Sequence, residues 1–286
     1  MAARSETGTA DVGALARIGG DERRAALALP RSGHVYDLGL DIDERMPMGP
    51  PQSFPAFSRA FCATAGGAAG EPPFEFAAEV VHGVLHTSTH IDAFVHVQRD
   101  GRIFGGAREC DTRTDRGFSR HGAETIPPIV GRAVVLDVAG AKGVEALADG
   151  YEITPDDLAE TLDRAGLAVE HGDIVLVRTG KLRDFWSKPE QFHLAQPGVG
   201  AAAAEWLFDR GMAVLGTDTS GTEPTPIRDP DRTTHVSMLV ERGVHLVENV
   251  ALDEICREGI ASGLFVCLPL RFTGATASWV RPVLIV

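Results

Sequence analysis

The amino-acid sequence predicts a mixed α/β fold in a single domain, in which strands outnumber helices. Short apolar or alternating stretches of strand length recur along the chain, and segments with helical spacing separate only some of them. Because strands and helices do not alternate strictly, the pattern favours a mixed sheet, or sheets, with helices packed outside over a simple doubly wound fold. The chain has 286 residues, 44% of them hydrophobic, which is enough to form a hydrophobic core. The sequence contains no internal repeat.

Strands are predicted where apolar residues alternate or form short buried runs. The predicted strands cover residues 34–40, 74–86, 132–138, 173–177, 213–218, 245–249, 264–270 and 280–286. The second of these places Phe74, Val80 and Val84 on one face and leads directly into the motif described below. His82 shares that face, which predicts a core or supporting histidine rather than a ligand.

Helices are predicted from capping residues and helical spacing. The clearest begins with Thr154 as a hydroxyl cap, Pro155 at the first helical position and Asp157 three residues after the cap, and it ends at Gly166. Asp21 is predicted to cap a short helix. The other helical segments are residues 11–29, broken at Gly19-Gly20, residues 200–210, residues 233–241 with Thr234 as cap, and residues 253–257.

Two stretches are predicted as loops. Residues 46–55 are rich in proline, which excludes a helix or a central strand, and their Met and Phe residues indicate an apolar loop over a pocket or at a subunit contact. Residues 62–73 are small and indicate a flexible loop. We therefore expect an N-terminal extension with short helices over residues 1–33 and one main domain over residues 34–286.

Charge and composition exclude several classes of partner. The net charge of −13 makes nucleic acid and an anionic membrane surface unexpected partners. The four cysteines are scattered without a CxxC pair, as in reduced cytosolic proteins. The first residues contain no apolar run, and no uncharged apolar run reaches the length of a membrane span. We expect a cytoplasmic protein that acts on a small molecule.

One stretch carries the chemistry: His86-Thr-Ser-Thr-His90-Ile-Asp92-Ala-Phe-Val-His96. Imidazole and carboxylate groups suit a divalent metal such as Zn²⁺ or Mn²⁺. A fully extended chain would separate His86 from His90 by roughly 13 Å, and a helix would turn Asp92 away from His90. We therefore expect a tight turn after a strand, with His86, His90 and Asp92 folded around a metal. The alternative is a hydroxyl-rich turn that carries solvated histidines.

Further ligands are expected from later in the chain. Glu248 lies in an otherwise apolar run and would be costly to bury unless it is paired or metal-bound. His235 opens a helix-like segment, whereas Glu241 lies on a predicted exposed helix face and is a weaker candidate. For Glu248 an exposed strand position, and for His235 a capping or surface role, are the alternatives. The remaining histidines are predicted to be structural or solvated: His34, His121, His171, His193 and His245.

Signals for other enzyme classes are missing from the sequence. The chain contains no GxSxG elbow, no P-loop and no GxGxxG after a strand. A serine hydrolase, an NTPase and a dinucleotide-dependent enzyme therefore have no support.

The eleven-residue motif resembles the HxGTHxDxPxH signature of the cyclase-like metal-dependent hydrolases, a family that includes bacterial kynurenine formamidase and isatin hydrolase. The resemblance covers roughly residues 34–286, because further segments that resemble the family occur in the same order along this chain. These segments are DIVLVRTG, AVLGTDT, THVSMLVERGVHLVEN and the closing LFVCLPLRFTGATASWVRPVLIV.

The resemblance implies a role for each matched residue. His86, His90 and Asp92 would hold a first metal ion, and Asp92 would bridge to a second that His235 and Glu248 complete. His96 would be the general acid/base. The implied fold is a swivelling β/β/α barrel-like core with helices packed outside, assembled as a homodimer or homotetramer, and the implied cofactor is one or two ions of Zn or Mn.

This chain departs from the family pattern at three places. Ser88 stands where the signature has Gly, and Phe94 stands where it has Pro and is expected to add bulk beside His96. Met48-Gly49-Pro50 stands where kynurenine formamidases have Trp-Pro-Gly, so we expect a different substrate loop.

The expected reaction is hydrolysis of an amide or lactone bond in a small cyclic or aryl substrate, such as a cyclic amide, imide or lactone, or an aryl formamide. Metal-activated water would attack the carbonyl, and His96 would move a proton. Two other enzyme functions remain open, kynurenine formamidase proper and a cyclase or dehydratase of secondary metabolism. The non-enzyme alternative is a metal-binding structural or sensor protein.

Overall fold

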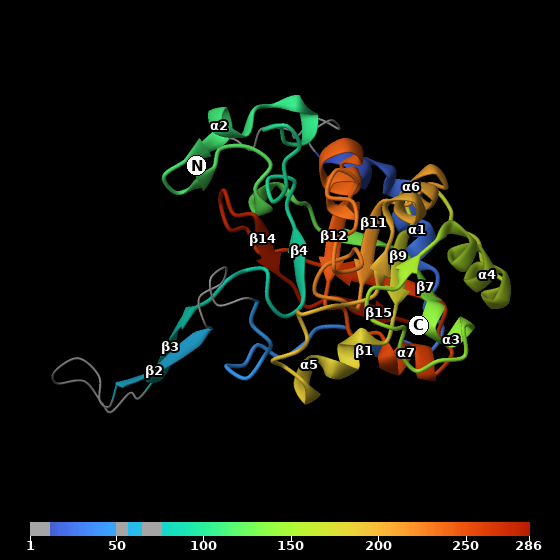
Figure 1. Cartoon of the computed structure of the whole chain (residues 1–286). Helices are drawn as coiled ribbons and strands as arrows, with labels where there is room; N and C mark the ends of the chain where they lie inside the picture. The colour runs from blue at the N-terminus through green and yellow to red at the C-terminus, as the bar shows by residue number, and fades with distance from the viewer. Residues whose placement is uncertain (1–11, 50–56, 65–75) are drawn as a thin grey trace.

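The computed structural model describes residues 12–49, 57–64 and 76–286, and a nine-stranded mixed sheet dominates this part of the chain (Figure 1). Its strands are β1 (Val35–Asp37), β4 (His90–Asp92), β7 (Ile129–Asp137), β9 (Ile174–Arg178), β11 (Val214–Thr217), β12 (His245–Glu248), β13 (Ser262–Cys267), β14 (Ala277–Trp279) and β15 (Val283–Ile285). They lie in the order β1-β15-β13-β7-β9-β11-β12-β4-β14. The neighbours β7, β9, β11 and β12 are parallel, and every other pairing is antiparallel.

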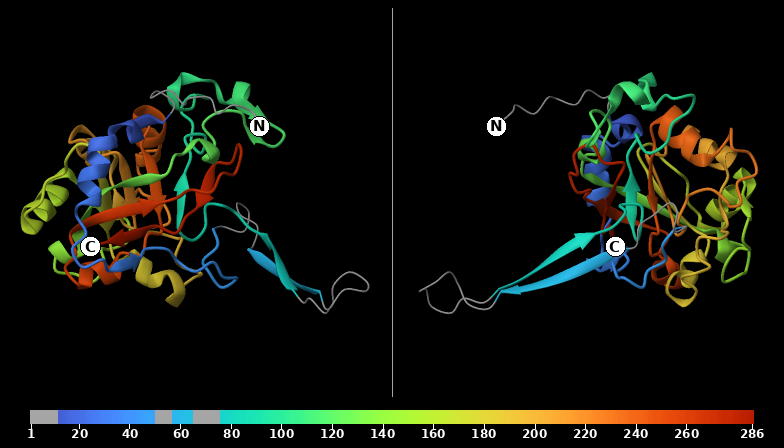
Figure 2. Two further views of the ribbon diagram at one scale, coloured as in Figure 1. Left: turned by 180° about the vertical axis from the view of Figure 1, so that it is seen from behind. Right: turned by 60° about the vertical axis from the view of Figure 1, so that its left-hand side comes forward.

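The sheet twists and curls, with helices on its outside, which confirms the mixed α/β, barrel-like core (Figures 1 and 2). The helices are α1 (Gly20–Leu27), α2 (Glu109–Thr112), α3 (Val138–Ala141), α4 (Pro155–Ala165), α5 (Asp184–Ser187), α6 (Ala201–Asp209) and α7 (Asp253–Arg257). Shorter turns are η1 (Gly13–Arg17), η2 (Phe104–Gly106), η3 (Ala123–Thr125) and η4 (Lys181–Arg183), and the π-helical segment η5 covers Val236–Arg242. None of the described helices is long and apolar enough to cross a bilayer.

Each face of the sheet carries its own hydrophobic cluster, because side chains alternate along the central strands. Ile174 and Leu176 point to the cluster beneath α1 and α7, while Val175 and Val177 point to the cluster beneath α4, α6 and η5. All four side chains are fully buried. The parallel strands are therefore covered on both faces, which explains why they appear in the sequence as continuous apolar runs.

Helix α4 forms as the sequence predicts. Thr154 accepts a hydrogen bond from the Asp157 N–H, the Asp157 carboxylate accepts one from the Thr154 N–H, and Gly166 ends the helix with a φ of 65°. The predicted caps of two other helices were wrong. At α1 the Glu22 carboxylate accepts from the Gly19 N–H in place of a cap by Asp21. At η5 the Thr233 hydroxyl accepts from the Val236 N–H, since Thr234 donates instead to the carbonyl of Val199.

The strand predicted over residues 74–86 does not join the main sheet. Its described part, β3 (Phe76–His82), pairs with β2 (Ser58–Thr64) in a separate hairpin that extends away from the body (Figure 2). Val80 is 61% exposed and His82 is exposed, so the prediction of a core histidine was wrong. Apolar and polar residues can alternate along a strand whether or not that strand packs on a core, so the alternation alone did not show where this strand lies.

The remaining short strands pair locally. They are β5 (Arg113–Thr114) with β6 (Gly117–Phe118), and β8 (Glu152–Ile153) with β10 (Gly198–Val199). Of the predicted loops, residues 50–56 and 65–73 lie outside the described residues, as do residues 1–11, whereas residues 62–64 belong to β2.

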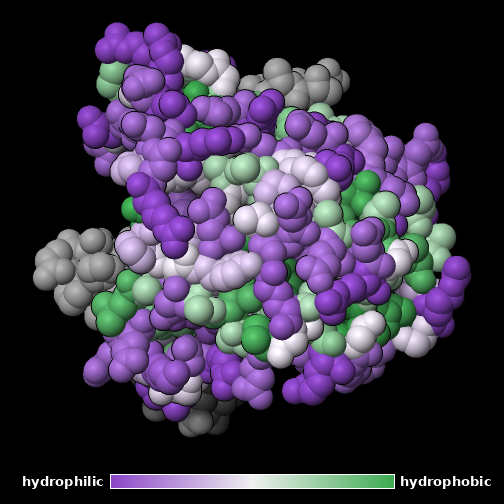
Figure 3. All heavy atoms as spheres, turned by 45° about the vertical axis from the view of Figure 1, so that its right-hand side comes forward, coloured by the Kyte–Doolittle hydropathy of each residue, from purple (hydrophilic) through white to green (hydrophobic). Residues whose placement is uncertain are grey.

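The N-terminal segment packs on the sheet, since α1 contacts β7 and β13 and Leu15 and Ile18 join the core. The domain boundary at residue 33 stays a prediction. The face shown in Figure 3 is largely hydrophilic, in keeping with the net charge of −13.

Candidate metal centre

The candidate site forms where β4 joins the carboxyl end of the parallel strands. β4 pairs with β12 so that His90 lies opposite Glu248. Two residues along β4, Asp92 points to the same side of the sheet as His90. The register therefore brings three of the predicted site residues, His90, Asp92 and Glu248, to one face at the point where β12 ends.

A tight turn before β4 adds His86, as the sequence predicts. Ser88 lies in this turn with a φ of 53°, a conformation that glycine adopts more easily, which explains the Gly of the family signature at this position. The Ser88 hydroxyl donates to the carbonyl of Leu40 at 3.2 Å, and the Ser88 carbonyl accepts from the amide of Asn249 at 2.9 Å. Ser88 thus keeps the turn that folds His86 back toward Asp92.

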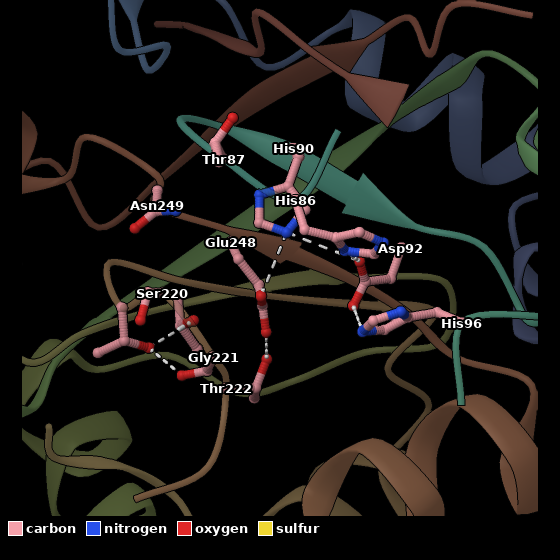
Figure 4. A network of polar contacts seen from close by, with 12 residues as sticks. His86, Thr87, His90, Asp92, His96, Ser220, Gly221, Thr222, Glu248 and Asn249 are labelled. Carbon is pink, nitrogen blue, oxygen red and sulfur yellow. Dashed lines mark hydrogen bonds and ion pairs between the residues drawn. The ribbon is translucent and has the colours of Figure 1, made fainter. Parts of the chain in front are cut away.

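Asp92 and Glu248 each offer their two oxygens to different histidines. Figure 4 shows His86, His90 and His96 around these two carboxylates. Asp92 Oδ1 lies 2.9 Å from His86 Nδ1 and 3.7 Å from His90 Nε2, while Oδ2 lies 3.4 Å from His235 Nε2 and 3.9 Å from His96 Nε2. Glu248 Oε2 lies 3.4 Å from His90 Nε2, and Oε1 lies 3.4 Å from His235 Nε2. All six predicted site residues therefore meet around two neighbouring groups of donor atoms.

Within the described part of the chain, three of these atoms are buried without a hydrogen-bond partner, namely His90 Nε2 and both Asp92 carboxylate oxygens. Leaving such groups unpaired in a protein interior is costly, so they call for a cation. Imidazole nitrogens and carboxylate oxygens are ligands of Zn²⁺ and Mn²⁺. The residues present therefore fit a divalent metal ion.

In His86, His90 and His235, one ring nitrogen faces the centre and the other contacts a different group, which fixes the orientation of the ring. His90 Nδ1 donates to the carbonyl of Ser88 at 3.0 Å, and His86 Nε2 is 2.9 Å from the Thr276 hydroxyl. His235 Nδ1 bonds the carboxylate of Glu223.

The electrostatics of the cluster follow from burial and mutual charge. Burial opposes protonation of His90, but Glu248 and Asp92 outweigh it and raise the pKa of His90. Burial likewise opposes protonation of His235, but Glu223 and Glu248 raise its pKa well above the usual value. Burial opposes ionisation of Asp92, yet the surrounding histidines, His96 and His86 first, hold the pKa of Asp92 well below its usual value. The Asp92 carboxylate thus stays ionised, as a metal ligand must be.

His96 differs from the other site histidines in its exposure and its pKa. Its side chain is 31% exposed, against 13% for His86 and 0% for His90. Its ring stacks on that of His86 with centroids 3.9 Å apart. Burial is the main cause that lowers the pKa of His96 to about 3, so its imidazole is neutral in the metal-free protein.

Phe94 does not line the site, so the expectation that it adds bulk beside His96 was wrong. The Phe94 side chain is 1% exposed and stacks on His245, with ring centroids 3.9 Å apart and an interplanar angle of 11°. His245 Nδ1 donates to the carbonyl of Asp92 at 2.7 Å. This pair therefore supports β4 from below, a structural role of the kind predicted for His245.

His245 should make the stability of the metal-free protein depend on pH. Burial lowers the pKa of His245 to about 4 from a usual value near 6.5. Its neutral form is therefore favoured in the fold, and this stabilisation is present above pH 6.5 and is lost as the pH falls toward 4. We expect this group to contribute about 3 kcal/mol to that loss. Urea unfolding of chelator-treated protein at both pH values measures it.

The matched variant is His245→Phe, which keeps an aromatic ring against Phe94 but does not titrate. At pH 7 the variant is expected to be less stable than the wild type, because it lacks the hydrogen bond to Asp92. Between pH 6.5 and 4 its free energy of unfolding should fall by about 3 kcal/mol less than that of the wild type. An unchanged pH dependence in the variant would contradict the assignment to His245.

Sequence reasoning missed residues that support the site from other elements. Glu223 bonds His235, and Thr222 donates to Glu248 at 2.9 Å. Neither was singled out, because no short motif links a loop residue to a ligand elsewhere in the chain. The weaker candidate Glu241 lies away from the site, where it pairs with Arg99 at the surface.

Comparisons with known proteins agree with this geometry. The sequence profile of the Cyclase family matches residues 36–224. The chain is 26% identical over 254 residues to a kynurenine formamidase of Delftia acidovorans, covering 87% of this chain and 96% of that protein. It is 31% identical over 182 residues to a kynurenine formamidase of Bordetella petrii, covering 63% of this chain and 75% of that protein.

Solved structures share the fold. A crystal structure described as a novel cyclase superposes with a TM-score of 0.87 at 25% identity, covering 96% of this chain and 94% of the other. Isatin hydrolase A from Labrenzia aggregata superposes with a TM-score of 0.64 at 22% identity, covering 87% and 92%.

The profile match, the relatives and the cluster of unpartnered donor atoms lead to the same conclusion. This chain is an enzyme that belongs to the cyclase family of metal-dependent hydrolases.

Proposed function

We propose that this enzyme hydrolyses an amide or lactone bond of a small cyclic or aryl substrate with the help of a divalent metal, Zn²⁺ or Mn²⁺. The observation that carries this proposal is the group of buried His, Asp and Glu ligand atoms that face one another. In the part of the chain that the structure describes, His90 Nε2 and both Asp92 oxygens of this group form no hydrogen bond. The names of the relatives, kynurenine formamidase and isatin hydrolase, support amide C–N bonds as the first substrates to test.

In this proposal the ligands divide into two groups. His86, His90 and Asp92 would hold a first ion, and His235 and Glu248, together with Asp92, would hold a second. The split orientation of the Asp92 oxygens, one toward His86 and one toward His235, supports two ions rather than one.

His96 is the proposed general acid/base. Bound divalent metal would polarise the substrate carbonyl and lower the pKa of a coordinated water toward about 7. The neutral His96 imidazole takes the proton of the attacking water and then returns it to the leaving nitrogen or oxygen. Its greater exposure suits this work, because it lies between the ligand cluster and solvent.

The substrate class follows from an apolar cluster beside the ligands. It consists of Met46, Phe57, Leu182, Phe185 and Phe192, and Trp279 packs against it. Trp279 lies directly opposite His90 in the pairing of β14 with β4. An apolar neighbourhood of this kind favours a flat aromatic or cyclic substrate over a charged one.

Two buried nitrogens near this cluster are suited to bind the polar atoms of such a substrate. His193 Nε2 and Trp279 Nε1 have no hydrogen-bond partner among the residues that the structure describes. Burial lowers the pKa of His193, so its imidazole is neutral, and it bonds the backbone of Pro47.

A substrate panel tests the proposed function. Metal-loaded protein is offered N-formylkynurenine, other aryl formamides, isatin, cyclic imides and lactones, and hydrolysis is followed by absorbance or chromatography. We expect turnover of at least one member, which stops when a chelator is added. If the metal-loaded enzyme hydrolysed none of them, a metal-binding structural or sensor role would be the better account.

Kynurenine formamidase proper is the second candidate, favoured by the relatives of that name. Efficient hydrolysis of N-formylkynurenine within this panel, ahead of the cyclic substrates, would select it. Formation of a cyclised or dehydrated product instead would favour a cyclase or dehydratase.

We also propose a cytoplasmic homodimer or homotetramer. The hairpin of β2 and β3 supports assembly, since residues 58–60 and 78–82 are exposed and an isolated two-stranded hairpin is at best marginally stable and gains from a second copy. Light scattering of the purified protein at several concentrations tests this, and a monomer at every concentration would contradict it.

A further inference from the structure

A short loop after β11, residues 219–223, touches two ligands that come from other elements. Thr222 contacts Glu248 on β12, and Glu223 contacts His235, which precedes η5. We propose that Glu223 and Thr222 are positioning residues that set the geometry of the second metal ion. This inference rests on the metal-dependent function proposed above.

Glu223 acts on His235 by fixing which nitrogen carries the hydrogen. An ionised carboxylate only accepts hydrogen bonds, so the contact requires the hydrogen on His235 Nδ1. The proton that His235 gives up when it binds a metal is then the one on Nε2, the atom that faces Asp92 and Glu248 at 3.4 Å from each.

Thr222 acts on the ligand opposite. Its hydroxyl donates to Glu248 Oε1 at 2.9 Å, and Oε1 is the oxygen that faces His235. Both side chains are buried, so this hydroxyl limits the rotation of the carboxylate about its last bond. Adjacent residues of one loop thus hold both ligands that the second ion does not share with the first.

The loop is itself fixed by Gln196, whose side chain is 2% exposed. The Gln196 amide nitrogen donates to the carbonyls of Gly221 and Glu223, and its oxygen accepts from the N–H and the hydroxyl of Ser220. In addition, the Thr222 carbonyl accepts from the Val199 N–H at 2.8 Å. A loop with this many hydrogen bonds is rigid and can therefore fix the positions of the ligand side chains that it contacts.

Metal titration tests the proposal without relying on activity. Metal-stripped protein is titrated with Mn²⁺ while the free ion is followed by electron paramagnetic resonance. The wild type is expected to bind two ions. Glu223→Ala is expected to weaken the second ion by roughly 10–100-fold and leave the first nearly unchanged, as for other residues that orient metal ligands. Glu223→Gln keeps an oxygen that can accept from Nδ1, so its loss should be smaller.

Glu205→Ala is the matched control. The Glu205 carboxylate accepts from the Ser237 hydroxyl at 2.9 Å, so its removal loosens the same segment η5 without touching His235. It should retain both ions with wild-type affinity. Thr222→Val, which removes only the hydroxyl, should weaken the second ion less than Glu223→Ala does.

The outcomes separate this inference from the function on which it rests. A wild-type protein that binds no ion would contradict the proposed function itself. A wild type that binds one ion, unchanged binding in Glu223→Ala, or an equal loss in Glu205→Ala would overturn the positioning role and leave the first site standing.

Discussion

Replacing Asp92 by asparagine is expected to abolish metal binding and reduce hydrolysis by roughly 10³-fold or more. Asp92 is fully buried, and its two oxygens face both groups of histidines, so one substitution removes charge from both proposed ions. A metal ion supplies several kcal/mol of transition-state stabilisation, and about 1.4 kcal/mol corresponds to a factor of ten in rate. Elemental analysis after dialysis, together with turnover of the best panel substrate, measures both effects.

Asparagine has nearly the size of aspartate, so the fold should survive, and thermal unfolding checks this. Asp115→Asn, at an exposed position, is the control and should behave like the wild type. His90→Ala should also lose metal. Unchanged metal content in Asp92→Asn and His90→Ala would refute ligation by these residues.

His96→Ala should separate catalysis from binding. We expect it to retain metal but to lose about 10²–10⁴-fold in kcat, the usual contribution of a general acid/base. Metal should be retained because the His96 imidazole lies 3.9 Å from Asp92, farther than the other three site histidines, and is the most exposed of the four. Metal analysis and steady-state kinetics on the same preparation give both numbers.

His171→Ala removes an exposed histidine outside the site and controls for the loss of an imidazole. Full activity in His96→Ala would exclude the acid/base role. Loss of metal from His96→Ala would instead make His96 a ligand, which its place beside His86 and Asp92 also allows sterically.

The sequence predicted the central sheet well because its parallel strands are buried on both faces. Runs such as DIVLV leave few alternatives to a buried strand, and residues 173–177 nearly coincide with β9. The hairpin of β2 and β3 was misplaced because alternation reveals a strand but not what lies under it. Phe94 was misplaced for a similar reason, since the direction of its side chain depends on the stack with His245, far away in sequence.

The site was predictable as a set of residues, because its ligands are chemically unusual in an apolar context. The six predicted residues do meet, although their roles remain a proposal. Glu223 and Thr222 could not be found in this way. Their effect depends on the fold of the loop around Gln196, and a Thr or Glu in a loop is most often solvated.

The central claim is that the cluster around Asp92 binds a divalent metal on which hydrolysis depends. The most direct measurement is turnover of chelator-stripped protein on the best panel substrate during stepwise addition of Zn²⁺ or Mn²⁺. We expect no turnover in the stripped protein and restoration that saturates as the bound ions fill the site. Full turnover in protein shown by elemental analysis to contain no metal would contradict the account.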